Sequence, residues 1–463
     1  MVILSILLAL IVFSILVFIH EFGHFLLAKK NGVKVIEFSI GFGPRLFSFD
    51  KGETKYSFKV IPFGGACQML NKDMISEEEM KKDKISDEED KISDEEMERD
   101  KIFEVEMEKE DLSRSFESKS VWARMSIVLA GPIFNFILAF VLAIIVIGTV
   151  GYDKPVVTNV GEGSSAMEAG LKEGDIITEY NGTGITISRQ IVLEDFVNPL
   201  SDKPVQIKYE RDGKEYETTI TPKYIERYII GFSYSMTKEE VKLSKLVKGG
   251  PLANAGVKEG DIIVGINGTK ISNGEELNEY FTKNPLTGEN ITVTVSRDGK
   301  EEDYSVTPMV TGSYSLGFNY NEGRVKTSAP GVLKYSCVEV GYQISTVFKS
   351  LGMLFTGQVT VKDFSGPVGI VDYIDTAYKE SKPDGALYIF LNIANLTMLL
   401  SANLGVMNLL PIPGLDGGRF LFQVIEVIFR RPVKHEEYFH LAGMILLMIF
   451  AMFILFQDIF KLF

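Results

Sequence analysis

The feature that most constrains this chain is an apolar run that contains a metal-binding motif. Residues 3–28 read ILSILLALIVFSILVFIHEFGHFLLA. This run can cross a bilayer, because a spanning helix needs about 20 apolar residues. Ionisable side chains cost roughly 2.5–3.5 kcal/mol each in such a segment, yet His20, Glu21 and His24 lie near its end. We therefore expect polar chemistry in or at the edge of a membrane.

The spacing of these polar residues predicts a zinc site. Histidines four residues apart share one face of a helix, where two neutral imidazoles can hold Zn²⁺. Glu21 between them can serve as general base. A chance match of this short pattern and a cleaved signal peptide are the alternatives. The run lacks a basic start, and Lys29 and Lys30 follow it, which favours a retained span.

Composition narrows the choice of a third ligand. The chain has four histidines, so that ligand must be His435, His440 or a carboxylate. Asp416 follows the third apolar span, and Gly417 and Gly418 after it permit close backbone approach. Asp416 is the favoured ligand, with a helix-capping role as the alternative. Two cysteines are too few for a Cys-ligated site, and the absence of a basic patch argues against nucleic acid binding.

Hydropathy predicts a polytopic α-helical membrane protein with four transmembrane helices. The expected spans are roughly Ile3–Ala28, Met125–Val150, Ala386–Leu410 and Phe439–Phe460. They lie within the segments 1–30, 123–151, 384–419 and 437–461, and the third segment also includes the LDGG sequence. Residues 35–69 alternate apolar and polar positions with Gly and Pro at the turns, which indicates a membrane-associated β region or an ordinary soluble hairpin.

Two further segments are polar or mixed. Residues 70–118 form an acidic, low-complexity insert that we expect to be solvated on the cytoplasmic side. Residues 330–357 mix apolar and polar side chains, which indicates an amphipathic helix on the membrane surface or an ordinary packed helix.

An internal repeat lies between the second and third spans. AGLKEGDII begins at Ala169, and AGVKEGDII begins 86 residues later at Ala255, with further matches in the same register. A constant offset indicates two copies of one domain, at residues 154–232 and 240–318. The pattern resembles PDZ domains, which implies an α+β fold and peptide binding by strand addition. Shielding of the membrane site is the alternative role.

Basic residues near the spans predict the orientation. They follow the first span, precede the second, and lie between the third and fourth, so these loops should be cytoplasmic. This orientation places the PDZ pair outside and the active site toward the cytoplasmic side.

Several motifs together resemble the site-2 protease family of intramembrane zinc proteases, most closely its regulator-of-sigma-E branch. The matching segments are HEFGH at His20–His24, GFGP at Gly41–Pro44, IPFGGACQM at Ile61–Met69, RSFESKSVWARM at Arg114–Met125, AGPIFNF at Ala130–Phe136, SGPVGI at Ser365–Ile370 and NLLPIPGLDGGR at Asn408–Arg419. They cover nearly the whole chain in the family's order. The acidic insert is longer than expected for that family.

The resemblance implies a set of site residues. It implies His20, His24 and Asp416 as zinc ligands and Glu21 as the catalytic base. It also implies that the β region re-enters the membrane and presents substrate as an extended strand. The implied substrate-binding residues are Gly43, Gly64, Gly65, Asn135, Asn408 and Pro411.

The resemblance implies an enzyme that lies in the lipid bilayer of the bacterial cytoplasmic (inner) membrane. The implied activity is hydrolysis of peptide bonds in or near the transmembrane segments of single-span membrane proteins. Anti-sigma factors and signal-peptide remnants are the expected substrate classes. A catalytically inactive PDZ-bearing membrane adaptor is the alternative function, and a transporter that uses intramembrane carboxylates is a third. The intact set of His20, Glu21, His24 and Asp416 argues against the adaptor.

Overall fold

The computed structural model describes residues 2–71, 112–234, 240–243, 245–321, 323–360, 366–431, 433 and 435–460. The expected acidic insert lies mostly outside these residues, and its solvated state stays a prediction. The chain divides into two compact units. One unit is Met1–Asp153 with Arg324–Phe463, and the other is Lys154–Gly323.

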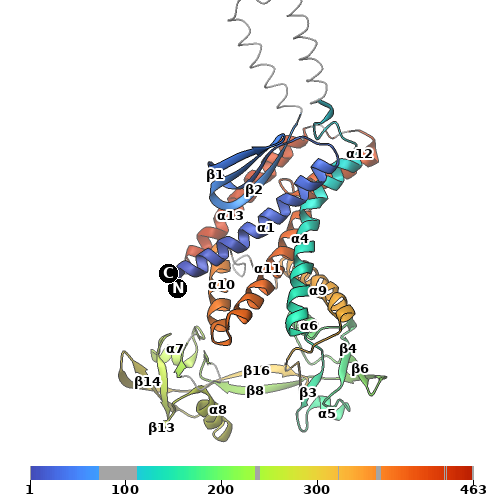
Figure 1. Ribbon diagram of the computed structural model, residues 1–463. Helices are drawn as coiled ribbons and strands as arrows, with labels where there is room; N and C mark the ends of the chain where they lie inside the picture. Colours follow the sequence, from blue (N-terminus) through green and yellow to red (C-terminus); the bar gives the residue numbers. More distant parts are fainter. Residues whose placement is uncertain are drawn as a thin grey trace, which may run out of the picture. The chain divides into compact units, whose positions relative to one another are not determined.

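Long helices dominate the first unit (Figure 1). They are α1 (Val2–Lys30), α4 (Val121–Val150), α9 (Ala329–Phe355), α10 (Pro367–Ser381), α11 (Ala386–Leu409), α12 (Asp416–Phe429) and α13 (Glu436–Phe460). Within the described residues, four of them, α1, α4, α11 and α13, are long and apolar enough to cross a membrane. The prediction of four apolar helices that are long enough to span a membrane is therefore confirmed for the described residues.

Small residues bring the central helices close together. A Cβ on Gly23 of α1 would overlap the carbonyl oxygen of Ala130 in α4, so the two backbones are nearly in contact. Ala139 and Ala143 of α4 pack against Ala402 of α11, and all three are fully buried. Small residues favour this close packing where lipid surrounds the helices.

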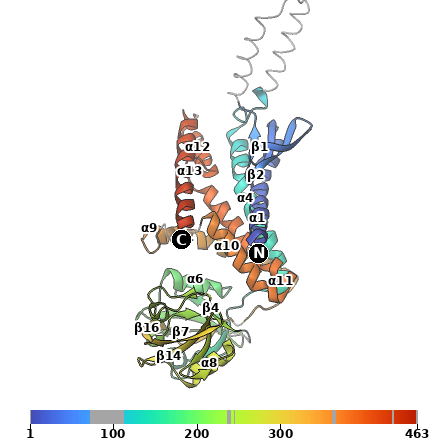
Figure 2. The ribbon, with the colours of Figure 1, turned by 90° about the vertical axis from the view of Figure 1, so that its left-hand side faces the viewer.

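The last helix packs more loosely than the others. α13 contacts α10 and α12, and Figure 2 shows α12 and α13 running alongside one another. Many of its apolar side chains are exposed, and Leu446 is 64% exposed. Such a surface suits lipid and not water.

The third expected span, Ala386–Leu410, is followed by a separate helix. α11 ends at Leu409 and α12 begins at Asp416, so the Asp-Gly-Gly sequence of the expected segment 384–419 belongs to a different helix from the span. Pro411 and Pro413 explain the break, because proline lacks a backbone N–H and disfavours helix in the residue before it. Asp416 therefore begins a separate helix.

Two further helices precede the third span in the sequence, α9 first and then α10. α10 is a helix before the third span that hydropathy did not reveal. α9 covers the segment expected at the membrane surface, and it packs against α4 and α11. Its buried face includes Ser336, Glu339 and Gln343.

The expected β region consists of two long strands, β1 (Val35–Lys51) and β2 (Thr54–Met69). Residues 37–40 pair with residues 65–68 on one side and with residues 55–58 on the other, so the strands fold back on themselves. Gly41, Gly43 and Gly64 have φ angles of 90°, 89° and 87°, which allow these bends. Figure 1 shows the resulting small sheet beside α1.

The second unit contains two similar sheets, as the repeat predicts. The first has the order β5 (Thr183–Gly184), β4 (Ile176–Tyr180), β6 (Val205–Arg211) and β7 (Lys214–Ile220), with α5 (Ser165–Glu168) and α6 (Arg189–Val197) nearby in the chain. The second has β10 (Val241–Lys242), β12 (Ile262–Ile266), β14 (Ile291–Arg297) and β15 (Lys300–Val306), with β13 (Thr269–Lys270) paired to β12, and with α7 (Pro251–Ala255) and α8 (Gly274–Lys283). Each copy holds a buried aspartate paired with a partly exposed arginine at 2.6 Å, Asp175 with Arg211 and Asp261 with Arg297.

The two copies exchange their last strands. β3 (Val157–Val160) of the first copy pairs with β17 (Phe318–Tyr320), and β11 (Lys245–Leu246) of the second pairs with β9 (Phe232–Ser233). The chain crosses between them through an antiparallel ribbon of β8 (Lys223–Ile229) and β16 (Met309–Ser315).

The hydrophobic cores show the same exchange. Leu316, Phe318 and Tyr320 pack in the first core, and Ile230 and Phe232 pack in the second. The expected boundaries, 154–232 and 240–318, assign β9 and β17 to the opposite copies. The second copy is thus inserted within the first.

Candidate metal centre

The two histidines of α1 lie one turn apart and are both 8% exposed. Nδ1 of His24 lies 2.8 Å from the carbonyl oxygen of Ile127 in α4. A carbonyl oxygen only accepts, so Nδ1 must carry the proton and donate it. Nε2 of His24 is left with a free lone pair, as metal ligation requires.

His20 is held by a side chain of α4. Nδ1 of His20 lies 3.1 Å from the Asn135 side-chain amide, and Asn135 is fully buried. The buried Oδ1 atom of Asn135 has no hydrogen-bond partner within the described residues. The nitrogen and oxygen of an amide are assigned from such contacts, and exchanging them lets His20 Nδ1–H donate to Oδ1. Nε2 of His20 is then free, as in His24.

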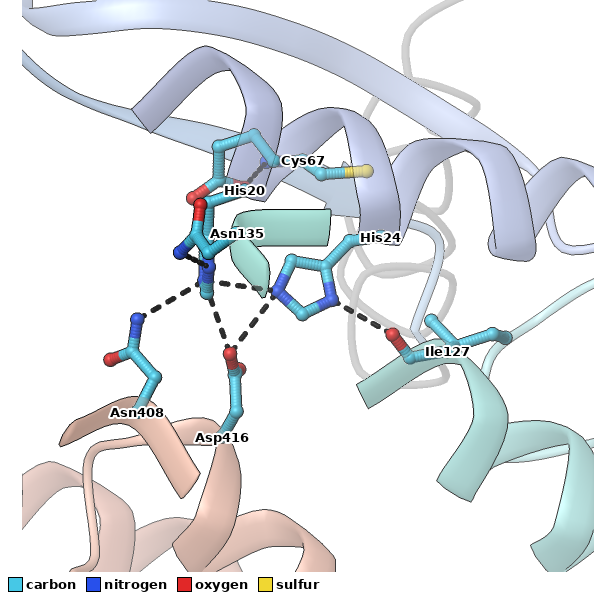
Figure 3. Close-up of polar contacts among 8 residues, drawn as sticks. His20, His24, Cys67, Ile127, Asn135, Asn408 and Asp416 are labelled. Carbon is cyan, nitrogen blue, oxygen red and sulfur yellow. Dashed lines mark hydrogen bonds and ion pairs between the residues drawn. The ribbon is translucent and has the colours of Figure 1, made fainter. Parts of the chain in front are cut away.

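Asp416 completes a cluster of three acceptor atoms (Figure 3). Its Oδ2 atom lies 3.1 Å from Nε2 of His20 and 3.3 Å from Nε2 of His24. The two Nε2 atoms are themselves 3.3 Å apart. Oδ2 is buried and has no hydrogen bond of acceptable geometry within the described part of the chain. Three lone-pair-bearing atoms therefore face one point.

This arrangement fits zinc. With metal–ligand bonds of 2.0–2.1 Å, the ligands of a tetrahedral zinc ion lie about 3.3 Å from one another. The three measured distances, 3.1, 3.3 and 3.3 Å, match that value. Two histidines and one carboxylate also form the kind of donor set found in catalytic zinc sites, where a fourth position stays open. His20, His24 and Asp416 are therefore the candidate ligands, and His435 and His440 lie outside this cluster.

Glu21 lies beside this cluster and is held by the β region. Its Oε2 atom accepts a hydrogen bond of 2.9 Å from the backbone N–H of Cys67 in β2. Gly65 permits the close approach, because a Cβ there would lie 2.9 Å from Val17 and 3.0 Å from Cγ of Glu21. The carboxylate keeps its other oxygen for chemistry.

A glycine of α4 makes room for the imidazoles. A Cβ on Gly131 would overlap Nε2 of His24 and would lie 2.7 Å from Cε1 of His20. Sequence reasoning gave Gly131 only as part of a family motif, without a physical role. The contact supplies that role, because only glycine lets α4 lie against both rings.

The residues expected to bind substrate have different surroundings. Asn408, at the end of α11, has its Nδ2 atom 3.5 Å from Nε2 of His20, so it borders the cluster. Gly65 lies next to Glu21, and Asn135 is enclosed behind His20. Gly43 and Gly64 lie at the bends of the β region, and Pro411 lies in the loop before α12. Their roles in substrate binding stay predictions.

The fold and the site together define the class of this protein. Two histidines and an aspartate with zinc spacing, a glutamate beside them and four apolar helices are the features of a membrane-embedded zinc metalloprotease. The model of the family described as peptidase family M50 matches residues 8–450. The chain therefore belongs to peptidase family M50, and it is a zinc metalloendopeptidase.

Named relatives match along almost the entire chain. The zinc metalloprotease RasP of Bacillus licheniformis is 28% identical, with 98% of each chain covered. The regulator of sigma-W protease RasP of Bacillus subtilis is 29% identical, covering 98% of this chain and 97% of its own. The regulator of sigma E protease of Haemophilus influenzae is 28% identical, with 98% of each covered. These matches confirm the resemblance and zinc as the cofactor.

Proposed function

We propose that this enzyme hydrolyses peptide bonds in or near the transmembrane segments of single-span membrane proteins. The observation that carries this proposal is the location of the site. Two of the three candidate zinc ligands belong to α1, a helix apolar enough to span a membrane. A protease with its metal ligands on such a helix acts on chains that enter the bilayer.

Each residue of the site then has a chemical task. Zinc, when bound, lowers the pKa of water and polarises the scissile carbonyl. Glu21 takes the proton from the attacking water and delivers it to the leaving amide nitrogen. The N–H of Cys67 holds the Glu21 carboxylate in place, and the Asn408 amide, which borders the cluster, is suited to contact the substrate carbonyl.

The β region supplies a surface for an unwound substrate. Residues 65–69 pair with β1 on one side, and the N–H of Cys67 points the other way, toward Glu21. A substrate strand added at this edge would lie against the catalytic carboxylate. Its backbone would recover hydrogen bonds that lipid cannot supply.

The repeats and the membrane orientation complete the proposal. The motif A-G-x-x-x-G-D in both copies supports PDZ domains, which we assign to the extracytoplasmic side of the bacterial cytoplasmic membrane. Basic residues beside the spans support this topology and an active site toward the cytoplasmic side. Two relatives are named regulator of sigma-W protease and regulator of sigma E protease. We therefore propose anti-sigma factors, or signal-peptide remnants, as the substrate class.

Replacement of the catalytic base tests the proposal. Glu21→Gln should abolish cleavage of a single-span substrate in reconstituted vesicles while zinc content stays at one ion per chain, because all three candidate ligands remain. Asp416→Ala should lose both the cleavage activity and the bound zinc, because it removes a candidate ligand. Normal cleavage by Glu21→Gln would overturn the mechanism. A wild-type enzyme that binds zinc but cleaves no membrane substrate would favour the adaptor.

A further inference from the structure

The loop between α11 and α12 determines where the third candidate ligand lies. Asn408 precedes this loop and borders the metal cluster, whereas Asp416 follows the loop and belongs to the cluster. Within the loop, Ile412 N–H donates to the Leu410 carbonyl at 2.7 Å, and Leu415 N–H donates to the Ile412 carbonyl at 3.1 Å. The loop is thus compact, and its position sets the position of Asp416.

The first turn of α12 rests directly on the loop backbone. A Cβ on Gly417 would overlap the carbonyl oxygens of Leu409 and Leu410. A Cβ on Gly418 would overlap the carbonyl oxygen of Ile412. Because no side chain separates them, a shift of the loop must move the start of α12 and Asp416 with it.

On its other side the loop rests on α13. A Cβ on Gly443 would overlap the carbonyl oxygen of Pro413, and a Cβ on Gly414 would lie 2.8 Å from the backbone nitrogen of Met444. Gly414 has a φ angle of 97°, which favours glycine. The loop is therefore held between α12 and α13 by backbone contacts.

One side chain of α13 adds a directed polar contact. Nδ1 of His440 accepts a hydrogen bond of 3.0 Å from the backbone N–H of Gly414. The imidazole ring packs against Phe422 of α12 with centroids 5.3 Å apart, and its Nε2 lies 3.4 Å from Oε1 of Glu436. His440 thus contacts the loop, α12 and its own helix at once.

We propose that His440 is a positioning residue for the zinc site, which fixes the loop that carries Asp416 through its bond to Gly414. The proposal rests on Asp416 as a zinc ligand. The proposal gives α13 a function besides anchoring. This loosely packed span then holds the loop that positions Asp416. His440 acts through the loop and does not touch the metal or the substrate.

Three variants of the full-length, detergent-solubilised protein separate the hydrogen bond from packing. His440→Asn keeps an acceptor near the position of Nδ1, whereas His440→Gln moves the acceptor one bond further along the side chain, and His440→Leu removes it. Zinc affinity is measured by competition with a chelator, and kcat and KM with a single-span substrate. Tyr438→Leu is the matched control, since Tyr438 is 68% exposed and contacts the ring of His435.

We expect His440→Leu and His440→Gln to lower zinc affinity about tenfold, as outer contacts of metal sites do. They should lower kcat at saturating zinc with little change in KM. His440→Asn and Tyr438→Leu should stay within about twofold of wild type. Wild-type zinc affinity in His440→Leu, or equal losses in the Asn and Leu variants, would overturn the proposal. If Asp416→Ala also kept zinc, the ligand assignment itself would fail.

Discussion

The backbone N–H of Cys67 donates a hydrogen bond of 2.9 Å to the carboxylate of Glu21, which joins the β region to the candidate catalytic base. The two residues belong to different elements and are separated by 46 positions in the chain. The small sheet, whose edge we propose as the binding surface for the substrate, therefore also holds the orientation of the Glu21 carboxylate.

This contact predicts opposite outcomes for two substitutions at one position. Cys67→Ala keeps the backbone N–H and should leave kcat within about threefold of wild type, whereas Cys67→Pro removes the donor. A hydrogen bond to a charged group contributes about 1.5–3 kcal/mol, so kcat should fall roughly 10- to 100-fold in the proline variant. Steady-state cleavage assays of the two zinc-loaded variants measure kcat for each. Equal activity in the two variants would show that the bond has no catalytic role.

The close contact of Gly131 with the imidazoles predicts a loss of metal on its substitution. In Gly131→Ala the new methyl group would occupy the space of His24 Nε2, so zinc affinity should fall by about 100-fold. Gly148→Ala in the same helix is the control, because its nearest heavy atom would be 3.9 Å away. Metal content after dialysis against a weak chelator distinguishes them. Retention of zinc by Gly131→Ala would place the ligands elsewhere.

The contact between Asn135 and His20 predicts a requirement for an acceptor. Asn135→Asp preserves an oxygen for the His20 Nδ1–H and should keep zinc, since carboxylate–histidine–zinc arrangements are common. Asn135→Leu has a similar volume and no acceptor, so zinc affinity should fall about 10- to 100-fold. Zinc titration of the purified variants is the measurement. If the Leu variant binds zinc normally while its KM rises, Asn135 contacts substrate, as the family resemblance implies.

The exchanged strands predict how the repeats respond to deletion. Met309 pairs with Ile229, so removing residues 230–308 and joining these ends by an Asn-Gly turn should leave the first copy folded. Removing residues 233–320 keeps the expected first domain but deletes Leu316, Phe318 and Tyr320 from its core. Loss of a large buried side chain costs about 3–5 kcal/mol, so this copy should unfold.

Limited proteolysis of the two deletion variants, with cleavage sites mapped within residues 154–220, measures the outcome. The second variant should be cut rapidly and the first should resist. The opposite order of sensitivity would contradict the exchange.

The sequence was sufficient to predict the features that a local pattern or a regular spacing encodes. The four-residue step from His20 to His24 fixes their common helix face, and long apolar runs identify the spans. A constant offset between repeats also identifies two copies of one fold, because equal spacing requires equal structure.

The sequence was insufficient where distant segments meet. The roles of Asn135, Gly131 and His440 depend on contacts between helices far apart in the chain, which no local pattern reveals. Strand exchange was hidden for a different reason. β9 and β17 carry the same Gly-Phe pattern, so either strand could complete either core.

The inserted arrangement of the repeats reverses the order in which they can fold during synthesis. All strands of the second core, from Ile230 to Val306, are contiguous in the chain. The first core needs Phe318 and Tyr320, so β3 must wait with an unpaired edge until the whole second copy has been made. The repeat that is synthesised first is therefore completed last, and a nascent chain that stalls between the two copies carries an open sheet.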